Sequence, residues 1–509
     1  MEGHNRRSDA ITAEPPVYES IQEKAREPIS DINEDISSTQ LPAYESVRKN
    51  KGGSSDDDAI GTCSPDDAVG SIVNETADLE QQKAASGHAH FHRLGWKRLT
   101  VVMIVEAIAL GSLSLPATFA ALGMVAGVIL CIGIGIIAIY TSYIIGQVKL
   151  KFPYMTSYAD AGQRMMGRFG YELFGAMFVL LLIFLTASHC LTGTIAFRVI
   201  TESGICSIIF GVVSAILLFL LAIPPSFAEV AILGYVDFVS ILLAIGITII
   251  GTGVVSGQAP GGLAAVNWSA WPKEDLNFSQ AFIAVSNICF AYSFAMCQFS
   301  FMDEMHTPKD YVKSITLLGA IEIVIYTVTG AVVYAFVGDT VKSPALLSAG
   351  PLLARIAFGV ALPVIFISGS INITVLGRYL HGRMFKKSVV RFINTKTGWL
   401  TWLGLIAVIT ILSFIIAEAI PIFQDLLSII SALFISGFTF YLPSLMWYMM
   451  LMEGKWYDWK NLPTAILNLV IFIIGLVVLV GGMYASVIDI MYNFATGHVG
   501  GSFTCGAPG

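Results

Sequence analysis

The sequence predicts an all-α polytopic membrane protein with eleven transmembrane helices, a cytoplasmic N-terminus and a C-terminus outside. Three observations support this fold class. The 509 residues are 55% hydrophobic and only 13% charged, far less charge than the surface of a soluble domain needs. Apolar runs of about 20 residues, the length that crosses a bilayer, recur from Val101 onward. Lys and Arg are concentrated in alternate connections between these runs.

The predicted spans follow the apolar runs in chain order. Their expected bounds are 99–121, 124–146, 172–200, 205–223, 231–254, 278–301, 315–337, 353–376, 399–417, 424–452 and 464–490. With the N-terminus inside, seventeen Lys and Arg lie at inner flanks and connections, and four lie at outer ones. The outer four are Arg198, Lys273, Lys342 and Arg355. Because basic residues stay on the cytoplasmic side, this difference sets the orientation.

The chain divides into a tail and a membrane domain. Residues 1–92 hold 18 acidic and 8 basic residues, a net charge of −10, and have almost no apolar periodicity. Such a segment cannot bury enough apolar surface to fold, so a disordered cytoplasmic tail is expected. Residues 93–495 form the predicted transmembrane domain, and 496–509 form a short outer tail.

The tail contains a short repeat, in which "PPVYESIQEK" is echoed by "LPAYESVRKN". Pro15, Pro16 and Tyr18 form a PPxY motif, and Pro42 and Tyr44 form a weaker version. Prolines favour the polyproline II conformation that WW domains bind. The motifs resemble docking sites for WW-containing ubiquitin ligases, so such a ligase is a predicted partner. The alternative is a chance match in a biased segment.

The connections assigned to the outside carry two sequons, at Asn267 and Asn277, where glycosylation is expected. Two cysteines, Cys206 and Cys505, also fall on this side, so a disulfide between them is compatible with their compartment. None of the seven cysteines forms a CxxC pair. No metal site and no cofactor are therefore expected, apart from a co-transported ion.

The first span is interrupted in a way that lipid does not tolerate without compensation. Within "EAIALGSLSLP", Glu106 places a carboxylate in the membrane, Gly111 weakens the helix, and Pro116 removes a backbone donor. Backbone groups freed in a membrane must bond to protein, water or ligand. The stretch from Ala109 to Ser114 is therefore predicted to be unwound, with N–H groups able to bind a carboxylate.

The sixth span holds a second polar interruption, "NICFAYSFAMCQFSFMDEM", from Asn287 to Met305. Five spans separate the starts of the two features, as an inverted repeat of five helices requires. The sequence therefore predicts a paired discontinuity, although two ordinary polar positions in a helix bundle remain the alternative.

Ionisable groups inside the spans are expensive and suggest function. Glu106 is the first candidate for proton coupling, against a structural carboxylate as the alternative, and His189 is the second, against a packing histidine. Asp237 and Glu322 are expected to be structural and paired with inner Lys or Arg. The outer acidic residues Glu418, Asp425 and Asp489 are expected to face water.

At this point the chain resembles a known family. "VEAIALGSLSLPATFAALG" is similar to the first helix of the amino acid/auxin permease family, and "FAYSFAMCQFSFMDEM" to its sixth. The resemblance covers residues 90–495 and is closest to fungal neutral amino acid permeases of the methyltryptophan-resistance type. It implies a leucine-transporter-type fold, with two inverted five-helix repeats plus one helix, and amino acid uptake driven by a cation gradient.

The resemblance also implies site residues. Backbone N–H groups of the first helix would bind the substrate carboxylate, and carbonyls of the sixth would bind the ammonium group. Hydroxyls of the eighth helix would help to hold an ion. The implied substrate-binding residues are Ala109, Gly111, Ser112, Leu113, Ser114, Phe290, Ala291, Tyr292 and Ser293, and the implied ion-coupling residues are Glu106, His189, Ser368 and Ser370.

The predicted function is import of neutral aliphatic or aromatic amino acids by proton symport at the plasma membrane. The predicted pocket is apolar and aromatic, with Phe294, Phe438 and Phe440 as further candidates. Two alternatives are sodium coupling and a vacuolar location. A third, from another class, is a receptor that binds an amino acid without transporting it. An enzyme is excluded because no nucleotide loop and no cluster of catalytic residues at a membrane face is present.

Overall fold

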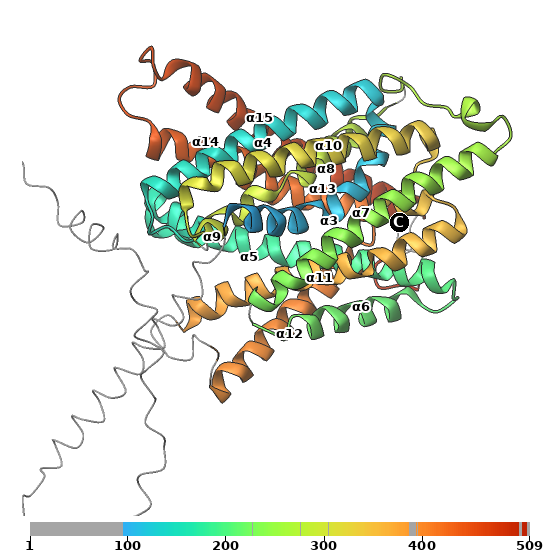
Figure 1. Cartoon of the computed structure of the whole chain (residues 1–509), viewed down its shortest axis with the longest axis horizontal. Coiled ribbons are helices and arrows are strands. Elements are labelled where there is room, and N and C mark those ends of the chain that lie inside the picture. The colour runs from blue at the N-terminus through green and yellow to red at the C-terminus, as the bar shows by residue number, and fades with distance from the viewer. Residues whose placement is uncertain are drawn as a thin grey trace, which may run out of the picture. The chain divides into compact units, whose positions relative to one another are not determined.

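A computed structural model describes residues 95–225, 227–274, 276–303, 305–385, 393, 395–497 and 501–505. Within these ranges, the side chains of Val102, Val105, Glu106, Ala109, Leu110 and residues 227–233 are not among those described. The described part is a bundle of helices running along a common direction (Figure 1). It confirms the all-helical prediction, and the predicted tail, residues 1–92, lies outside the described residues.

The helices follow the predicted spans in order. They are α3 (Trp96–Leu122), α4 (Met124–Lys151), α5 (Tyr158–Thr201), α6 (Ser207–Leu221), α7 (Phe227–Gln258), α8 (Phe278–Ala291), α9 (Gln298–Asp303), α10 (Tyr311–Val337), α11 (Pro351–Met384), α12 (Lys396–Ala419), α13 (Phe423–Ile430), α14 (Leu442–Met446) and α15 (Leu462–Thr496). A π-helical segment, Ser431–Tyr441, joins α13 to α14, and a second one, Trp447–Leu451, follows α14.

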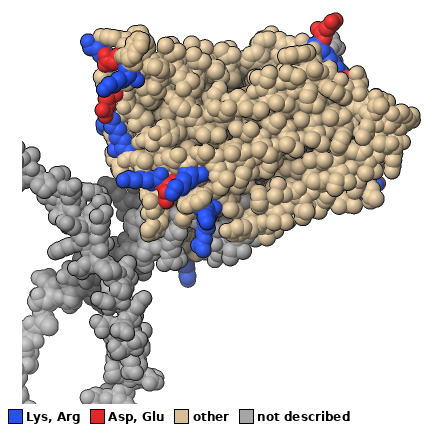
Figure 2. All heavy atoms as spheres, turned by 45° about the horizontal axis from the view of Figure 1, so that its top comes forward, with Lys and Arg blue, Asp and Glu red and all other residues tan. Residues whose placement is uncertain are grey.

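Nine helical segments of the described part are long and apolar enough to cross a membrane. Two further predicted spans correspond to shorter apolar helices, Gly111–Leu122 within α3 and Ser207–Leu221. On the face drawn in Figure 2, charged side chains gather toward the ends and leave a broad uncharged band between them. Such a band is what a lipid-facing surface requires. The chain is therefore a multi-pass membrane protein. The predicted number of eleven spans is reached in the described part only if the two shorter helices also cross the membrane.

The predicted unwinding of the first span is wrong, because α3 is helical throughout Trp96–Leu122 with Pro116 inside it. Hydroxyl groups bond back to the helix at this point. Ser112 donates to the Ile108 carbonyl at 2.9 Å, and Thr118 donates to the Ser114 carbonyl at 3.0 Å. Each of these carbonyls also accepts the helical N–H bond of the same residue, so the hydroxyls are occupied within the helix and do not replace the bond that Pro116 removes from the Ser112 carbonyl.

The helix ends where Gly123 adopts φ 80°. A Cβ atom at this residue would lie 2.5 Å from the carbonyl carbon of Trp271, in the loop that covers this end of the helix. Only glycine fits both the left-handed backbone and the close approach. Backbone bonds from Met124 and Val125 to Ser269 and Ala270 hold the loop in place.

The predicted break in the sixth span is confirmed. Helix α8 ends at Ala291, Tyr292 leaves helical geometry with ψ 45°, and a 3₁₀ turn, Phe294–Cys297, leads into the short helix α9. The segment is among the most enclosed of the molecule, with 89% of its apolar stretch buried, against 33% for α4. The irregular backbone is therefore surrounded by protein, as a membrane demands.

Two predictions about the outer side, one on cysteines and one on acidic residues, have different outcomes. Cys206 and Cys505 are joined by a disulfide with Cα atoms 4.4 Å apart, which confirms the compatible pairing. The expectation that the outer acids face water is wrong for Glu418 and Asp425, which are 8% and 1% exposed, because Glu418 lies against Gly211 of α6 and Asp425 beside Asp489 of α15.

Candidate functional site

The two segments singled out by the sequence meet in space, at Gly111 of α3 and Ala291 of α8. A Cβ atom on Gly111 would lie 2.8 Å from the Cα atom of Ala291 and 3.0 Å from its Cβ atom. Main chains approach this closely only when one side chain is absent. The contact places the end of α8, and the break that follows it, directly against the middle of the first helix.

A small cavity opens on the inner side of this contact, with room for about one water molecule. Its lining comes from α3 and from the segment after the break in the sixth span. The lining residues are Met103, Ala107, Ser293, Phe294, Met296 and Phe301. Apart from the Ser293 hydroxyl, these side chains are apolar, so the cavity suits a neutral group.

The structure brings some of the predicted site residues together and separates others. Ser293 lines the cavity, and Gly111 and Ala291 form the adjoining contact. Phe290 and Tyr292 are buried but do not line this cavity, so their role as pocket walls stays a prediction. Tyr292 instead packs edge-on against Tyr326, with ring centroids 5.2 Å apart.

The other first-helix candidates are also committed to local contacts. Ser112 and Leu113 are buried in the helix, and Ser114 donates to the Gly111 carbonyl at 2.9 Å. The side chain of Ala109 lies outside the described residues. Because α3 is unbroken, its N–H groups bond within the helix, so the predicted carboxylate site on this backbone is not formed in the structure.

Four cavity residues were missed by the sequence prediction: Met103, Ala107, Met296 and Phe301. A signal was present for two of them. Met103 and Ala107 precede Gly111 at intervals of four, and residues spaced by four share one face of a helix. Phe294, a predicted pocket residue, does line the cavity, whereas the predicted Phe438 packs against Tyr158, with ring centroids 4.6 Å apart.

The buried acids differ from the expectation that they pair with basic residues. Asp237 and Glu322 are both 0% exposed, and neither has an ion-pair partner among the described residues. The Ser368 hydroxyl donates to Asp237 Oδ2 at 2.8 Å, and Oδ1 has no partner in the described part. This bond links α7 to α11 and joins a predicted ion-coupling residue to a carboxyl group that was predicted to be structural.

The remaining ion-coupling candidates lie on three helices. His189 of α5 is 4% exposed and hydrogen-bonds the Ile365 carbonyl of α11. Ser370 donates to the Ile367 carbonyl of its own helix at 2.8 Å. Glu106 belongs to α3, and its side chain lies outside the described residues.

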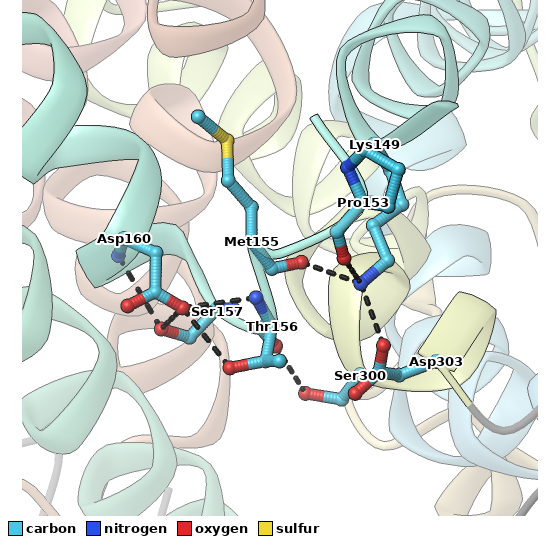
Figure 3. A network of polar contacts seen from close by, with 8 residues as sticks. All are labelled: Lys149, Pro153, Met155, Thr156, Ser157, Asp160, Ser300 and Asp303. Carbon is cyan, nitrogen blue, oxygen red and sulfur yellow. Dashed lines mark hydrogen bonds and ion pairs between the residues drawn. The ribbon is translucent and has the colours of Figure 1, made fainter. Parts of the chain in front are cut away.

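A polar network ties the inner end of α4 to α9, the half of the sixth span below the break (Figure 3). Lys149, with a side chain only 5% exposed, forms an ion pair with Asp303 at 2.6 Å. Its Nζ also donates to the carbonyls of Pro153 and Met155, at 2.9 and 2.6 Å. One ammonium group therefore joins the loop after α4 to the end of α9.

The same loop leads into α5 through a capping box. Asp160 accepts from the backbone N–H groups of Thr156 and Ser157 at 2.9 and 3.0 Å, and its own N–H bonds to the Ser157 hydroxyl (Figure 3). Tyr158, which follows Ser157 in the chain, is 3% exposed. Its hydroxyl lies 2.9 Å from the Ala295 carbonyl oxygen and 3.1 Å from the Phe438 carbonyl oxygen. The inner side of the break is thus covered by protein.

Comparison with known proteins identifies the family of the chain. Residues 92–488 match the family model described as transmembrane amino acid transporter protein. The chain belongs to this family. Because members of this transmembrane amino acid transporter family move amino acids across membranes, the protein is an amino acid transporter and not an enzyme.

Individual relatives extend over most of the chain. The N amino acid transport system protein of Neurospora crassa is 62% identical over 428 residues, which cover 84% of this chain and 91% of that protein. A transmembrane transporter of Gibberella moniliformis is 28% identical and covers 86% of this chain and 93% of the relative. The chain is also similar to a solved structure of Mhp1, a nucleobase-cation-symport-1 family transporter, in a closed conformation with bromovinylhydantoin bound. The TM-score is 0.46 and the sequence identity is 12%, and the match covers 80% of this chain and 93% of Mhp1.

Several predicted features remain untested. The WW-ligand residues Pro15, Pro16, Tyr18, Pro42 and Tyr44 lie outside the described residues. Both sequon asparagines are exposed and hydrogen-bonded: Asn267 donates to Asp339 at 2.7 Å, and Asn277 caps α8 by accepting from Gln280 N at 2.7 Å.

Substituting Gly111 by Ala is expected to reduce amino acid uptake by at least about fivefold, since overpacking costs about 1–3 kcal/mol. The added Cβ would meet the backbone of Ala291, which no side-chain rotation can relieve. The measurement is initial uptake per transporter at the cell surface. Gly133→Ala is the matched control, because nothing lies within 4 Å of a Cβ at Gly133. Equal uptake by both variants would contradict the assigned contact.

Substituting Lys149 by Met is expected to weaken closure of the inner side. Vesicles preloaded with labelled amino acid should then release it roughly fivefold faster, the factor that about 1 kcal/mol provides. Lys151→Met is the control, because Lys151 bonds Glu453 at 3.3 Å with side chains 39% and 87% exposed, and exposed ion pairs contribute little. Matching efflux rates in the two variants would argue against a role for the network in closure.

Proposed function

We propose that this amino acid transporter imports neutral amino acids, aliphatic or aromatic, by proton symport with alternating access. The observation that carries the proposal is the break in the sixth span beside Gly111, next to a cavity that has room for about one water molecule and must widen before it holds an amino acid. Its lining contains no charged side chain among the described residues, and it includes two phenylalanines and two methionines. Apolar walls favour an uncharged side chain, because a buried charge without a partner is strongly unfavourable.

Alternating access requires elements that move relative to the site, and the break in the sixth span supplies one. Helix α9 is only six residues long and joins the 3₁₀ turn of the break at one end and the Lys149–Asp303 pair at the other. A short helix with an irregular joint can tilt as a unit when the pair opens. In the proposed cycle, closure at the inner side and opening at the outer side therefore occur together.

For the proton, the proposal favours Asp237 over the other buried acids. Its carboxyl group is completely buried, has no basic partner among the described residues, and bonds to Ser368 of α11. An ionised carboxylate is costly in such surroundings, so the group is suited to hold a proton while enclosed and to release it when water reaches it. Glu106 and His189 are the other candidates, and sodium coupling through Ser368 and Ser370 is the alternative.

The remaining parts of the proposal concern architecture and location. The break in the sixth span lies five spans after the first, which supports a leucine-transporter-type inverted repeat with one extra helix. The predicted outer sequons and the PPxY motif suit the plasma membrane and a WW-domain ubiquitin ligase as a regulatory partner. The name of the Neurospora relative, an N amino acid transport system protein, supports amino acids as the substrate class.

The transport proposal is tested by uptake of labelled neutral amino acids into proteoliposomes. An inward proton gradient should produce accumulation, and removal of sodium should leave it unchanged. Cationic and anionic amino acids should compete weakly, at least about tenfold less than leucine or phenylalanine, because one buried charge costs more than 1.4 kcal/mol. Binding without accumulation would favour a receptor, and accumulation that needs sodium would replace the proton in the proposal.

The assignment of Asp237 is tested by Asp237→Asn, which keeps the shape and can still accept from Ser368. The variant should exchange amino acids across the membrane yet lose accumulation driven by the proton gradient. Glu322→Gln is the matched control, because Glu322 is equally buried but has no bond to α11. If the Asp237 variant still accumulated amino acid with the proton gradient and the Glu322 variant did not, the proton site would be assigned to Glu322 of α10 instead.

A further inference from the structure

Helix α8 carries a buried amide that no neighbour satisfies. The side chain of Asn287 is 0% exposed, and neither its Nδ2 nor its Oδ1 has a hydrogen-bond partner in the described part of the chain. Burial of an amide without partners is unfavourable, most of all in a membrane protein where water is scarce. A residue of this kind therefore needs an explanation, and a polar ligand is one.

A structural asparagine in the same protein shows the contrast. Asn468 of α15 is also 0% exposed, but its Nδ2 donates to the Tyr140 hydroxyl at 2.9 Å and to the Thr464 carbonyl at 2.8 Å. Its amide therefore joins α15 to α4. Asn287 joins nothing among the described residues, so packing of the bundle does not account for it.

Asn287 lies next to the Gly111–Ala291 contact, on the side opposite the cavity. It precedes Ala291 by four residues in α8, so the two side chains project from nearly the same face, about 6 Å apart along the helix axis. Ala291 is the residue that touches Gly111. The amide therefore lies one turn outward of the contact, on the face that α8 turns toward α3.

The neighbouring residue points elsewhere. Ser286 is equally buried and its hydroxyl is also without a partner among the described residues. A Cβ on Gly482 of α15 would lie 2.6 Å from Ser286 Oγ, so this hydroxyl faces α15. Two adjacent polar residues of one helix thus face different partners, which provides a natural control.

The geometry of α3 supplies the reason for a side-chain donor. The helix is continuous through Gly111 to Ser114, so its main-chain N–H groups are used within the helix. A substrate carboxylate next to Gly111 then needs a donor from another element. A neutral amide suits this task, since it donates to an anion without leaving a buried charge of its own.

We propose that Asn287 is a substrate-binding residue, whose Nδ2 group donates a hydrogen bond to the α-carboxylate of the transported amino acid. The inference rests on the proposed function and adds a residue to its site. It also explains how the protein distinguishes an amino acid from a compound of the same shape without a carboxylate. A site built to bond a polar group rejects analogues that lack it, because its own donor is then left unpaired.

The test uses the full-length transporter in proteoliposomes, with L-leucine and L-leucinamide as probes. Asn287→Leu should raise the KM for leucine by at least about tenfold, the loss expected for a hydrogen bond to a charged group. Asn287→Asp should raise it further as the pH increases, because the new carboxylate repels that of leucine. The Asp variant should also bind leucinamide better relative to leucine than the unmodified protein does. Ser286→Ala should leave the KM within about twofold.

Equilibrium binding of leucine to purified protein provides a second measurement that does not require transport. It keeps the inference testable if the Leu variant fails to reach the membrane, since the Asp variant has nearly the same size as the original residue. A leucine affinity within twofold of the unmodified protein in both Asn287 variants would overturn the proposal. So would an equal loss in the Ser286 variant. If the unmodified protein binds leucine but does not accumulate it, the proposed symport is contradicted. The role of Asn287 is then decided by the binding measurement alone.

Discussion

The close approach of main chains at Gly111 and Ala291 is the constraint on which the centre of this molecule depends. It requires a glycine on α3, and it lets the sixth span end its first helix against the middle of the first span. In lipid, an interrupted helix is tolerated only where protein surrounds it. The contact supplies that surrounding on one side, and α10, α13, α15 and the π-helical segment supply packing for α3 and α8 on others. The cavity and the unsatisfied amide of Asn287 both lie next to this point.

The two sides of the break are held by different means. Toward the inner side, Lys149 and Tyr158 attach the backbone around α9 with ionic and hydroxyl hydrogen bonds. Toward the outer side, α8 carries buried polar groups without partners, at Ser286 and Asn287. Satisfied networks make a structure rigid, whereas unpaired polar groups favour any rearrangement that supplies a partner. The distribution of hydrogen bonds thus matches a protein closed to the inside and prepared for a ligand.

The sequence predicted the class, the order of the spans and the position of the second break, because apolar length and small polar residues are local signals. It was wrong about the first span, since Gly111 and Pro116 weaken a helix while the packing of α3 against α8 and α10 keeps it continuous. The pocket walls were only partly predicted. Tyr292 and Phe294 look equivalent in sequence, and only the turn after Ala291 decides that the second lines the cavity and the first packs on Tyr326. The bond between Asp237 and Ser368 joins residues 131 positions apart, which no local pattern reveals.

The disulfide at the outer surface has a mechanical consequence. Cys505 lies beyond α15 and is bonded to Cys206 at the start of α6, while Ser502 donates to the Ala419 carbonyl at the end of α12. The C-terminal segment is therefore tied covalently to the start of α6 and touches the end of α12 through one exposed hydrogen bond. The disulfide limits how far the start of α6 can move away from the segment after α15. A transport cycle that moves the outer end of α6 must then carry the C-terminal segment with it.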